Sequence, residues 1–180
     1  PENRLLARGP RYRLDGETLR DQALYVSGSL RDDLGGPPVK PYQPNGIWDA
    51  VAYSGSNTRY YKADTGDALY RRSLYTFWKR TAPPPNMVVF DAPSRENCSV
   101  RRDRTNTPLQ ALTLMNDPQY VEAARNLAQR AFSEGKGSSD ESITTMYRLA
   151  LGMTPPEKHQ DILERSYSKF HESFKKTPSN

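Results

Sequence analysis

The stretch that decides the fold reads DAPSRENCSVRRDRTNTPLQALTLMND, residues 91–117. It holds the only cysteine, the densest arginine cluster and the clearest helix start of the chain. Residues Thr107-Pro108-Leu109-Gln110 have the pattern of a capping box with proline at the first helical position. The pattern predicts that a helix begins at Thr107 and that a long loop containing the arginines precedes it.

The spacing of apolar residues on both sides of this stretch is helical. Between the predicted helices lies loop 35–66, which is rich in proline and glycine and breaks regular structure. Gly152 is expected to end one helix, and short strands are expected over 58–62 and 87–90. The fold class predicted is mainly α, an irregular helical domain with long Pro/Gly-rich loops and at most a minor β element. Helices are expected from Asp15, over 67–80, and from Thr107, Asp117, Ser138 and Thr154.

Length and composition predict a single domain over residues 1–180. Hydrophobic residues make up only 35% of the chain and there are 15 prolines, so we expect a modest core wrapped in stiff loops. Residues 1–134 are expected to form a main body that includes loop 35–66 and a central segment, 91–117. Residues 138–180 are expected to form a C-terminal helical pair. Because the chain opens without a methionine, we expect it to be a fragment of a longer protein.

The composition also disfavours several kinds of site and partner. A single cysteine excludes an internal disulfide and a multi-cysteine metal site. Cys98 is expected to be an inert thiol, since the only histidines, His159 and His171, fall on the last predicted helix. These two histidines are twelve residues apart, and we predict no metal site. No apolar run approaches the ~20 residues of a membrane span, and no nucleic-acid-binding motif is present, so neither partner is expected.

Three runs of sequence resemble one family closely: residues 90–93, residues 101–112 and residues 116–120. They are similar to the planctomycete-specific PSD-type domain, a bacterial domain of unknown function. The resemblance implies the C-terminal end of a large exported protein, hence an extracytoplasmic location, with an upstream domain of the same protein as partner. It also implies a c-type cytochrome-like segment upstream. Since this chain has no Cys-x-x-Cys-His motif, we expect no cofactor here and place any haem on the missing upstream part.

The arginine cluster is the sharpest candidate site. Arg95, Arg101, Arg102 and Arg104 lie within ten residues, immediately before the predicted helix start. Guanidinium groups beside a helix N-terminus suit a sulfate, a phosphate or a glycan carboxylate. The alternative is structural, since arginines also pair with carboxylates and would then pin the loop to the helices. Both interpretations remain open at the level of sequence.

A second candidate lies in the aromatic-rich part of loop 35–66. Trp48, Tyr60 and Tyr61 offer flat apolar faces on which a sugar ring can stack. The same rings are equally suited to holding a long loop down by packing. The sequence favours neither role.

No catalytic residue is predicted. Thr107 and Gln110 are explained by the capping box, and Asn106 by its tendency to form turns. Glycoside hydrolysis needs two carboxyl groups at a set separation, and sequence alone does not identify such a pair among the acidic residues of the central segment. We therefore expect a non-catalytic interaction module that docks on its upstream domain or binds an anionic extracellular ligand. The alternative is part of an enzyme that acts on a sulfated or acidic polysaccharide.

Overall fold

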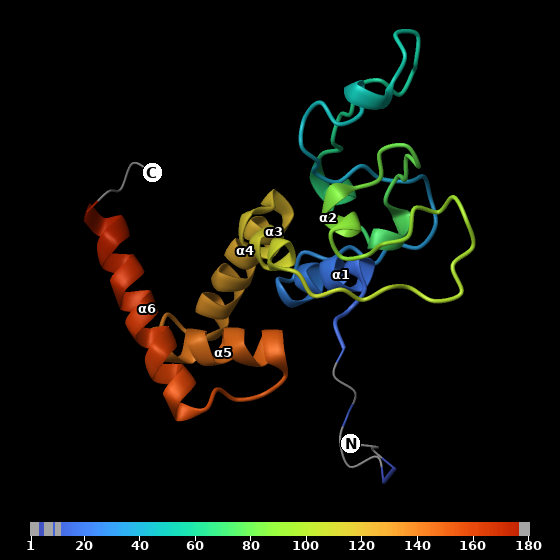
Figure 1. Cartoon of the computed structure of the whole chain (residues 1–180). Helices are drawn as coiled ribbons and strands as arrows, with labels where there is room; N and C mark the ends of the chain where they lie inside the picture. The colour runs from blue at the N-terminus through green and yellow to red at the C-terminus, as the bar shows by residue number, and fades with distance from the viewer. Residues whose placement is uncertain (1–3, 6–8, 10–11, 177–180) are drawn as a thin grey trace. The chain divides into compact units, whose positions relative to one another are not determined.

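The computed structural model describes residues 4–5, 9 and 12–176, and Figure 1 shows the path of the chain. The chain divides into two compact units. Unit 1 comprises Pro1–Gln22 and Leu30–Val121, and unit 2 comprises Ala23–Ser29 and Glu122–Asn180. The boundary falls inside two helices, so the parts of each helix are described with the unit to which they belong.

The prediction of a mainly α fold is confirmed. Within the described residues, β structure is limited to two isolated parallel bridges, Arg31 with Arg71 and Val39 with Thr76. No helix in this part of the chain is long and apolar enough to cross a membrane. Short 3₁₀ turns occupy Asp49–Val51, Gly66–Tyr70 and Ser73–Tyr75. The α-helices are α1 (Gly16–Val26), α2 (Pro85–Val88), α3 (Pro108–Asn116), α4 (Pro118–Glu134), α5 (Ser139–Leu151) and α6 (Glu157–Lys176).

The centre of unit 1 contains a buried arginine. The side chain of Arg20, on α1, is only 2% exposed. Its Nε donates to Gln119 Oε1 at 2.6 Å, and its terminal nitrogens donate to Leu69 O at 2.7 Å and Arg71 O at 2.9 Å. Burial lowers the pKa of this guanidinium, an effect that the nearby Asp21 carboxylate opposes. One side chain therefore joins α1, the turns around residue 70 and the start of α4.

The predicted helix over 67–80 is wrong. The segment forms two 3₁₀ turns separated by extended backbone at Arg71 and Arg72. Its backbone groups bond to other parts of unit 1 instead of to the next helical turn: Tyr70 O accepts from Arg31 N at 3.0 Å, and Tyr75 O accepts from Val39 N at 2.8 Å. Tertiary hydrogen bonds replace the helical ones, and Leu74, which the apolar spacing would turn inward, is 67% exposed.

Both predicted strands are also wrong. Residues 58–62 form turns and bends without a ladder. Residues 87–90 instead belong to or follow the short helix α2, which has Pro85 at its N-terminal position. Proline presets the helical φ there, and Val88 N bonds to Pro84 O at 3.1 Å. The β-branched residues Val88 and Val89 therefore indicated strand where the preceding prolines determine a helical turn.

Loop 35–66 is held down by polar contacts. The guanidinium of Arg71, a residue 9% exposed, donates to Pro37 O at 3.1 Å and Asp33 O at 2.9 Å. It also stacks 4.0 Å from the centre of the Tyr75 ring, and the Tyr75 hydroxyl accepts a hydrogen bond from Gly35 N at 2.8 Å. These contacts fix the N-terminal end of the loop on the turns that replaced the predicted helix.

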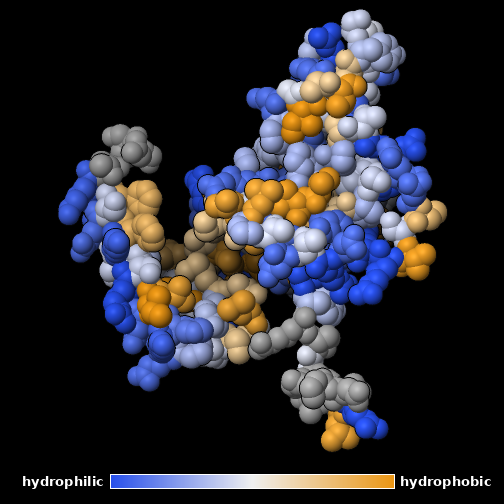
Figure 2. Space-filling view, viewed as in Figure 1, coloured by the Kyte–Doolittle hydropathy of each residue, from blue (hydrophilic) through white to orange (hydrophobic). Residues whose placement is uncertain are grey.

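Unit 2 is built from the larger part of α4 and from α5 and α6, which pack on each other. Ser138 caps α5, since its Oγ accepts from Glu141 N, and Gly152 ends it with a left-handed φ of 68°, as predicted. Gly135 lets the turn between α4 and α5 close tightly, because a Cβ there would lie 2.8 Å from Ser142 Oγ. None of the residues of α6 is buried, and apolar surface follows this helix (Figure 2).

Candidate functional site

The arginines of the central segment open onto a cavity of about 560 Å³ in unit 1. The central segment is exposed from Ser94 to Leu109. The cavity lies next to the start of α1. Its walls combine arginines and one aspartate from the loop with Asp15, which immediately precedes α1. The lining residues are Asp15, Arg101, Arg102, Asp103 and Arg104.

Two of these arginines are paired with the start of α1. Arg102 donates to Glu17 Oε2 at 2.8 Å and lies 3.9 Å from Asp15 Oδ2. Arg104 lies 3.8 Å from Asp15 Oδ1 and stacks 4.4 Å from the centre of the Tyr12 ring. Because both side chains are about two-fifths exposed (38% and 44%), these are surface ion pairs. Such pairs contribute roughly 0–1 kcal/mol each.

The other two predicted arginines lie apart from these pairs. Arg101 is exposed and makes no ion pair or side-chain hydrogen bond with any residue in the described part of the chain. Arg95 has a left-handed φ of 64° and stacks 4.3 Å from the centre of the Trp78 ring. The cavity thus brings together Arg101, Arg102 and Arg104, and Arg95 is not among its lining residues.

Both ends of the arginine-rich loop are joined by Asp91. Its carboxylate accepts hydrogen bonds from Thr105 N at 2.7 Å and Thr105 Oγ1 at 2.9 Å, and it pairs with Arg13. Desolvation alone raises the pKa of Asp91, but the bonds from Thr105 and Arg13 outweigh it and leave the pKa below its ordinary value. Asp91 is therefore a structural clamp that closes loop 91–105.

The capping box predicted at Thr107 is confirmed. Gln110 Oε1 accepts a hydrogen bond from Thr107 N at 3.3 Å. Gln110 Nε2 donates to Val89 O at 3.0 Å and to Thr105 Oγ1 at 3.1 Å. Every polar atom of this amide is engaged in holding α3 to α2 and to the Asp91 clamp. This agrees with a structural role for both residues.

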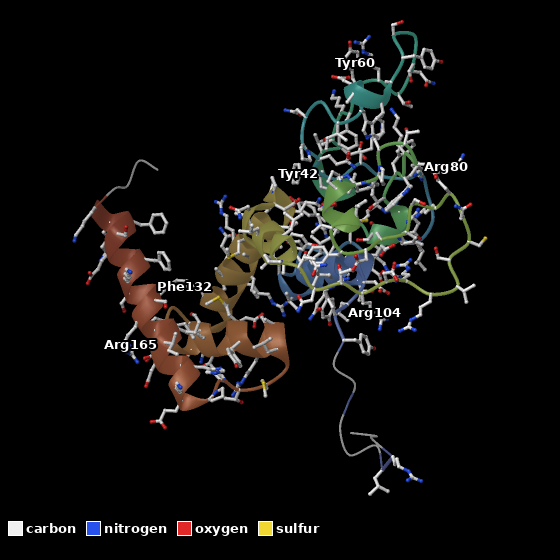
Figure 3. The ribbon with its side chains drawn as sticks, viewed as in Figure 1. Tyr42, Tyr60, Arg80, Arg104, Phe132 and Arg165 are labelled. Atoms are coloured by element: carbon white, nitrogen blue, oxygen red, sulfur yellow. The ribbon has the colours of Figure 1, made fainter. Side chains whose placement is uncertain are left out.

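The aromatic candidates are separated by burial. Trp48 is 1% exposed, and its ring packs against Tyr61 at 4.9 Å and Phe77 at 5.5 Å between ring centres. Its faces are therefore closed to a sugar. Tyr61 is partly buried and donates its hydroxyl proton to Pro41 O. Tyr60 is 71% exposed but lies on the projecting part of the loop, well away from Arg104 (Figure 3).

No group of three His, Cys, Asp or Glu side chains that would hold a metal ion occurs among the described residues. Cys98 is exposed. In unit 2, His159 Nδ1 shares a hydrogen bond with the Tyr147 hydroxyl at 2.9 Å, and His171 stacks on Tyr167 at 5.5 Å. Both histidines are thus engaged with a tyrosine.

A second cavity in unit 1 was not predicted from the sequence. It is a groove of about 420 Å³ between α2 and α3, closed at one end by the start of α4. Two of its polar residues, Asn86 and Asp117, follow a proline run and a helix, so in the sequence they resemble a turn former and an N-cap. The sequence shows that α3 is rich in apolar residues but not that they are exposed. The structure leaves four of them open to solvent: Leu109, Leu112, Leu114 and Met115.

Fold and site together define a small, mainly helical module with surface cavities and an arginine-rich loop. The family PSD1, described as a protein of unknown function (DUF1553), matches residues 1–167. The chain belongs to this family. No curated protein and no solved structure matches it significantly.

Proposed function

We propose that this chain is a non-catalytic binding module whose arginine-rich loop takes up an anionic ligand, a sulfated or carboxylated polysaccharide. The observation that carries the proposal is Arg101. It is exposed and without a carboxylate partner among the described residues, in a cavity that two further arginines line. A guanidinium presents a planar fork of donors that matches the oxygens of a sulfate or a carboxylate.

The existing ion pairs do not prevent such binding. Arg102 and Arg104 pair with Asp15 and Glu17 in exposed geometry, where each pair contributes roughly 0–1 kcal/mol. A sulfate that contacts two guanidiniums at once replaces such a pair at little cost. The acidic residues, Asp15 and Asp103, lower the net charge of the lining and favour a ligand of modest charge density.

The alternative, part of a polysaccharide-cleaving enzyme, requires an acid or base next to the arginines and an aromatic platform. Acidic groups are present, since Asp15 and Asp103 line the arginine cavity, but Asp91 is engaged by Thr105 and Arg13. The aromatic platform is not formed there, because Trp48 is buried and no tryptophan or tyrosine of the described chain lines that cavity. These contacts favour binding over catalysis. The extracytoplasmic setting and the docking on an upstream domain belong to the same proposal and rest on the family resemblance.

The test is binding of the chain to dextran sulfate, polygalacturonate and neutral dextran, at about 20 mM and about 500 mM salt. The informative variant is Arg101→Gln, and the matched control is Arg125→Gln. Arg125 lies on α4 and, like Arg101, is exposed and forms no ion pair among the described residues. We expect salt-sensitive binding to one charged polymer, weakened about five-fold by Arg101→Gln and little changed by the control. Equal effects of the two variants, or no binding to either charged polymer, would refute the proposal.

A further inference from the structure

The groove between α2 and α3 combines apolar walls with two polar groups, the Asn86 amide and the Asp117 carboxyl, that line it. The walls come from Leu109 and Leu112 on α3, from Pro85 and Val89 at α2, and from Pro44 in the loop. Leu109 and Leu112 are 57% and 52% exposed, and apolar surface lies over α2 and α3 in Figure 2. Tyr42, labelled in Figure 3, also lines this groove.

The first polar group is Asn86 on α2. The residue is 7% exposed, yet its side-chain amide makes no hydrogen bond to any residue that the structure describes. The amide atoms are not fully closed off from solvent, so they are accessible from the groove that the residue lines. The amide offers a carbonyl oxygen and an NH₂ group side by side, which is the complement of one peptide group of an extended chain.

The second polar group is Asp117, at the junction of α3 and α4. Its Oδ1 accepts from Gln119 N at 2.9 Å, and the residue forms no ion pair within the described chain. Burial raises the pKa of this carboxyl, and the Gln119 N–H and the charge of Arg20 act in the opposite direction. The Arg20 donors point elsewhere, to Leu69, Arg71, Ser73 and Gln119. A cation placed at this end of the groove would therefore find a partly desolvated carboxylate that has no cationic partner.

We propose that the groove is a docking site for an extended peptide segment of a partner protein that carries an apolar side chain next to a lysine or arginine. The apolar side chain lies between Leu109, Leu112 and Val89. The peptide group beside it bonds to the Asn86 amide, and the basic side chain reaches Asp117. This site is separate from the arginine cavity and goes beyond the anion-binding function.

The probes are capped tetrapeptide amides titrated into the full chain and followed by amide NMR shifts. One set contains Leu next to Lys in either order, a second replaces Lys with Glu, and a third replaces Leu with Ser. We expect the Leu–Lys peptides to shift the side-chain amide signal of Asn86 and the backbone signals of α3. The other two sets should bind at least ten-fold more weakly.

Three variants separate binding from stability. Asn86→Leu removes an amide that makes no hydrogen bond within the described chain, so the fold should be about as stable as the wild type, while affinity for the Leu–Lys peptides falls at least ten-fold. Asp117→Asn keeps the acceptor for Gln119 N and should remove the preference for Lys over Glu. Leu112→Lys should abolish binding, whereas Leu74→Lys, at a leucine that is 67% exposed in the same unit, should not.

Three results would overturn the proposal. One is equal affinity for the Leu–Lys and Leu–Glu peptides. Another is undiminished binding in Asn86→Leu. The third is the absence of any shift up to about 10 mM peptide, since a single side chain in a shallow groove still gives millimolar affinity.

Discussion

The substitution Arg20→Met tests the polar centre of unit 1. It keeps a long unbranched side chain of similar shape but removes all the donors of a side chain that is 2% exposed. Leu69 O, Arg71 O and Gln119 Oε1 would then lose a buried donor. Gln119 is not free to turn away, because its Nε2 is bonded to Tyr42 O at 3.1 Å.

Two effects of opposite sign decide the magnitude. Each buried acceptor left unpaired costs roughly 1–3 kcal/mol, which gives about 3–9 kcal/mol for Leu69 O, Arg71 O and Gln119 Oε1 together. Removing the buried charge returns part of this, since an arginine surrounded mainly by neutral acceptors carries a desolvation penalty of its own. The nearest carboxylate, Asp21, is 3.8 Å away and partly exposed, so it offsets little of that penalty. We expect a net loss of about 3 kcal/mol in the free energy of unfolding.

The assay is urea denaturation followed by tryptophan fluorescence. The chain has two tryptophans, Trp48 and Trp78, and both lie in unit 1, so the signal reports the unit that contains Arg20. The control is Arg80→Met, at an exposed arginine of the same unit, which should change stability by less than about 0.5 kcal/mol. If Arg20→Met matched the control or raised stability, the hydrogen bonds would not outweigh the cost of burying the charge, and this account of the core would be refuted.

Three further perturbations follow from the contacts described. Asp91 has a pKa below its ordinary value of 3.8, so its carboxylate stabilises the fold above that pH and loses this effect as pH falls through the folded-state pKa. Asp91→Asn, which tolerates the left-handed φ of 60°, should therefore lower the melting temperature at pH 7 but much less at pH 3. A difference in melting temperature that does not depend on pH would contradict this role of Asp91. Asp117 has a raised pKa, so its effect on stability runs the other way: the free energy of unfolding of the wild type declines as pH rises from 3.8 through the folded-state pKa. Urea titrations should show that the stability of Asp117→Asn increases relative to the wild type between pH 3 and pH 7. A stability difference that stays constant over this range would rule out the desolvated carboxyl. Gly135→Ala places a Cβ 2.8 Å from Ser142 Oγ and 3.0 Å from Ala131 O, and it should lower the stability measured by thermal melting of the helical signal by about 1–3 kcal/mol. Gly152→Ala is strained only by its φ of 68° in open space and should cost about 1 kcal/mol. A larger loss of stability in Gly152→Ala than in Gly135→Ala would show that the turn between α4 and α5 relaxes.

The sequence predicted most of the helices whose start and stop signals are local, although α6 begins at Glu157 and not at the predicted Thr154. The capping box at Thr107, the N-cap Ser138 and the glycine at 152 act within one turn, and each lies where it was expected. The segment 67–80 has an equally good apolar period but no cap. Its backbone is bonded instead by Arg31 and Val39, residues more than thirty positions away in the sequence. Periodicity therefore predicted neither the hydrogen bonds of this segment nor the exposure of Leu74, which is 67% exposed.

The candidate site was predictable to the same limit. Residue type and spacing identified the arginine cluster, and Arg101, Arg102 and Arg104 do share one cavity. Sequence cannot show that Arg95 turns to Trp78 or that Trp48 is buried, because those outcomes depend on what lies opposite in the fold. Arg102 pairs with Asp15 and Glu17. In the sequence these two acidic residues are explained by their position at the start of a helix, where they also interact favourably with the helix dipole.

What distinguishes binding residues from structural ones in this chain is therefore the state of their hydrogen-bonding groups and not their type. Arg20, Arg71 and Gln110 have polar side chains directed at backbone oxygens of several segments, and each holds those segments together. Arg101 and Asn86 carry the same functional groups, a guanidinium and an amide, but make no such bonds within the described chain. Substitution of Arg20, Arg71 or Gln110 should therefore lower stability, whereas substitution of Arg101 or Asn86 should lower only affinity. Loss of stability in both Arg101→Gln and Asn86→Leu would refute the distinction for this fold.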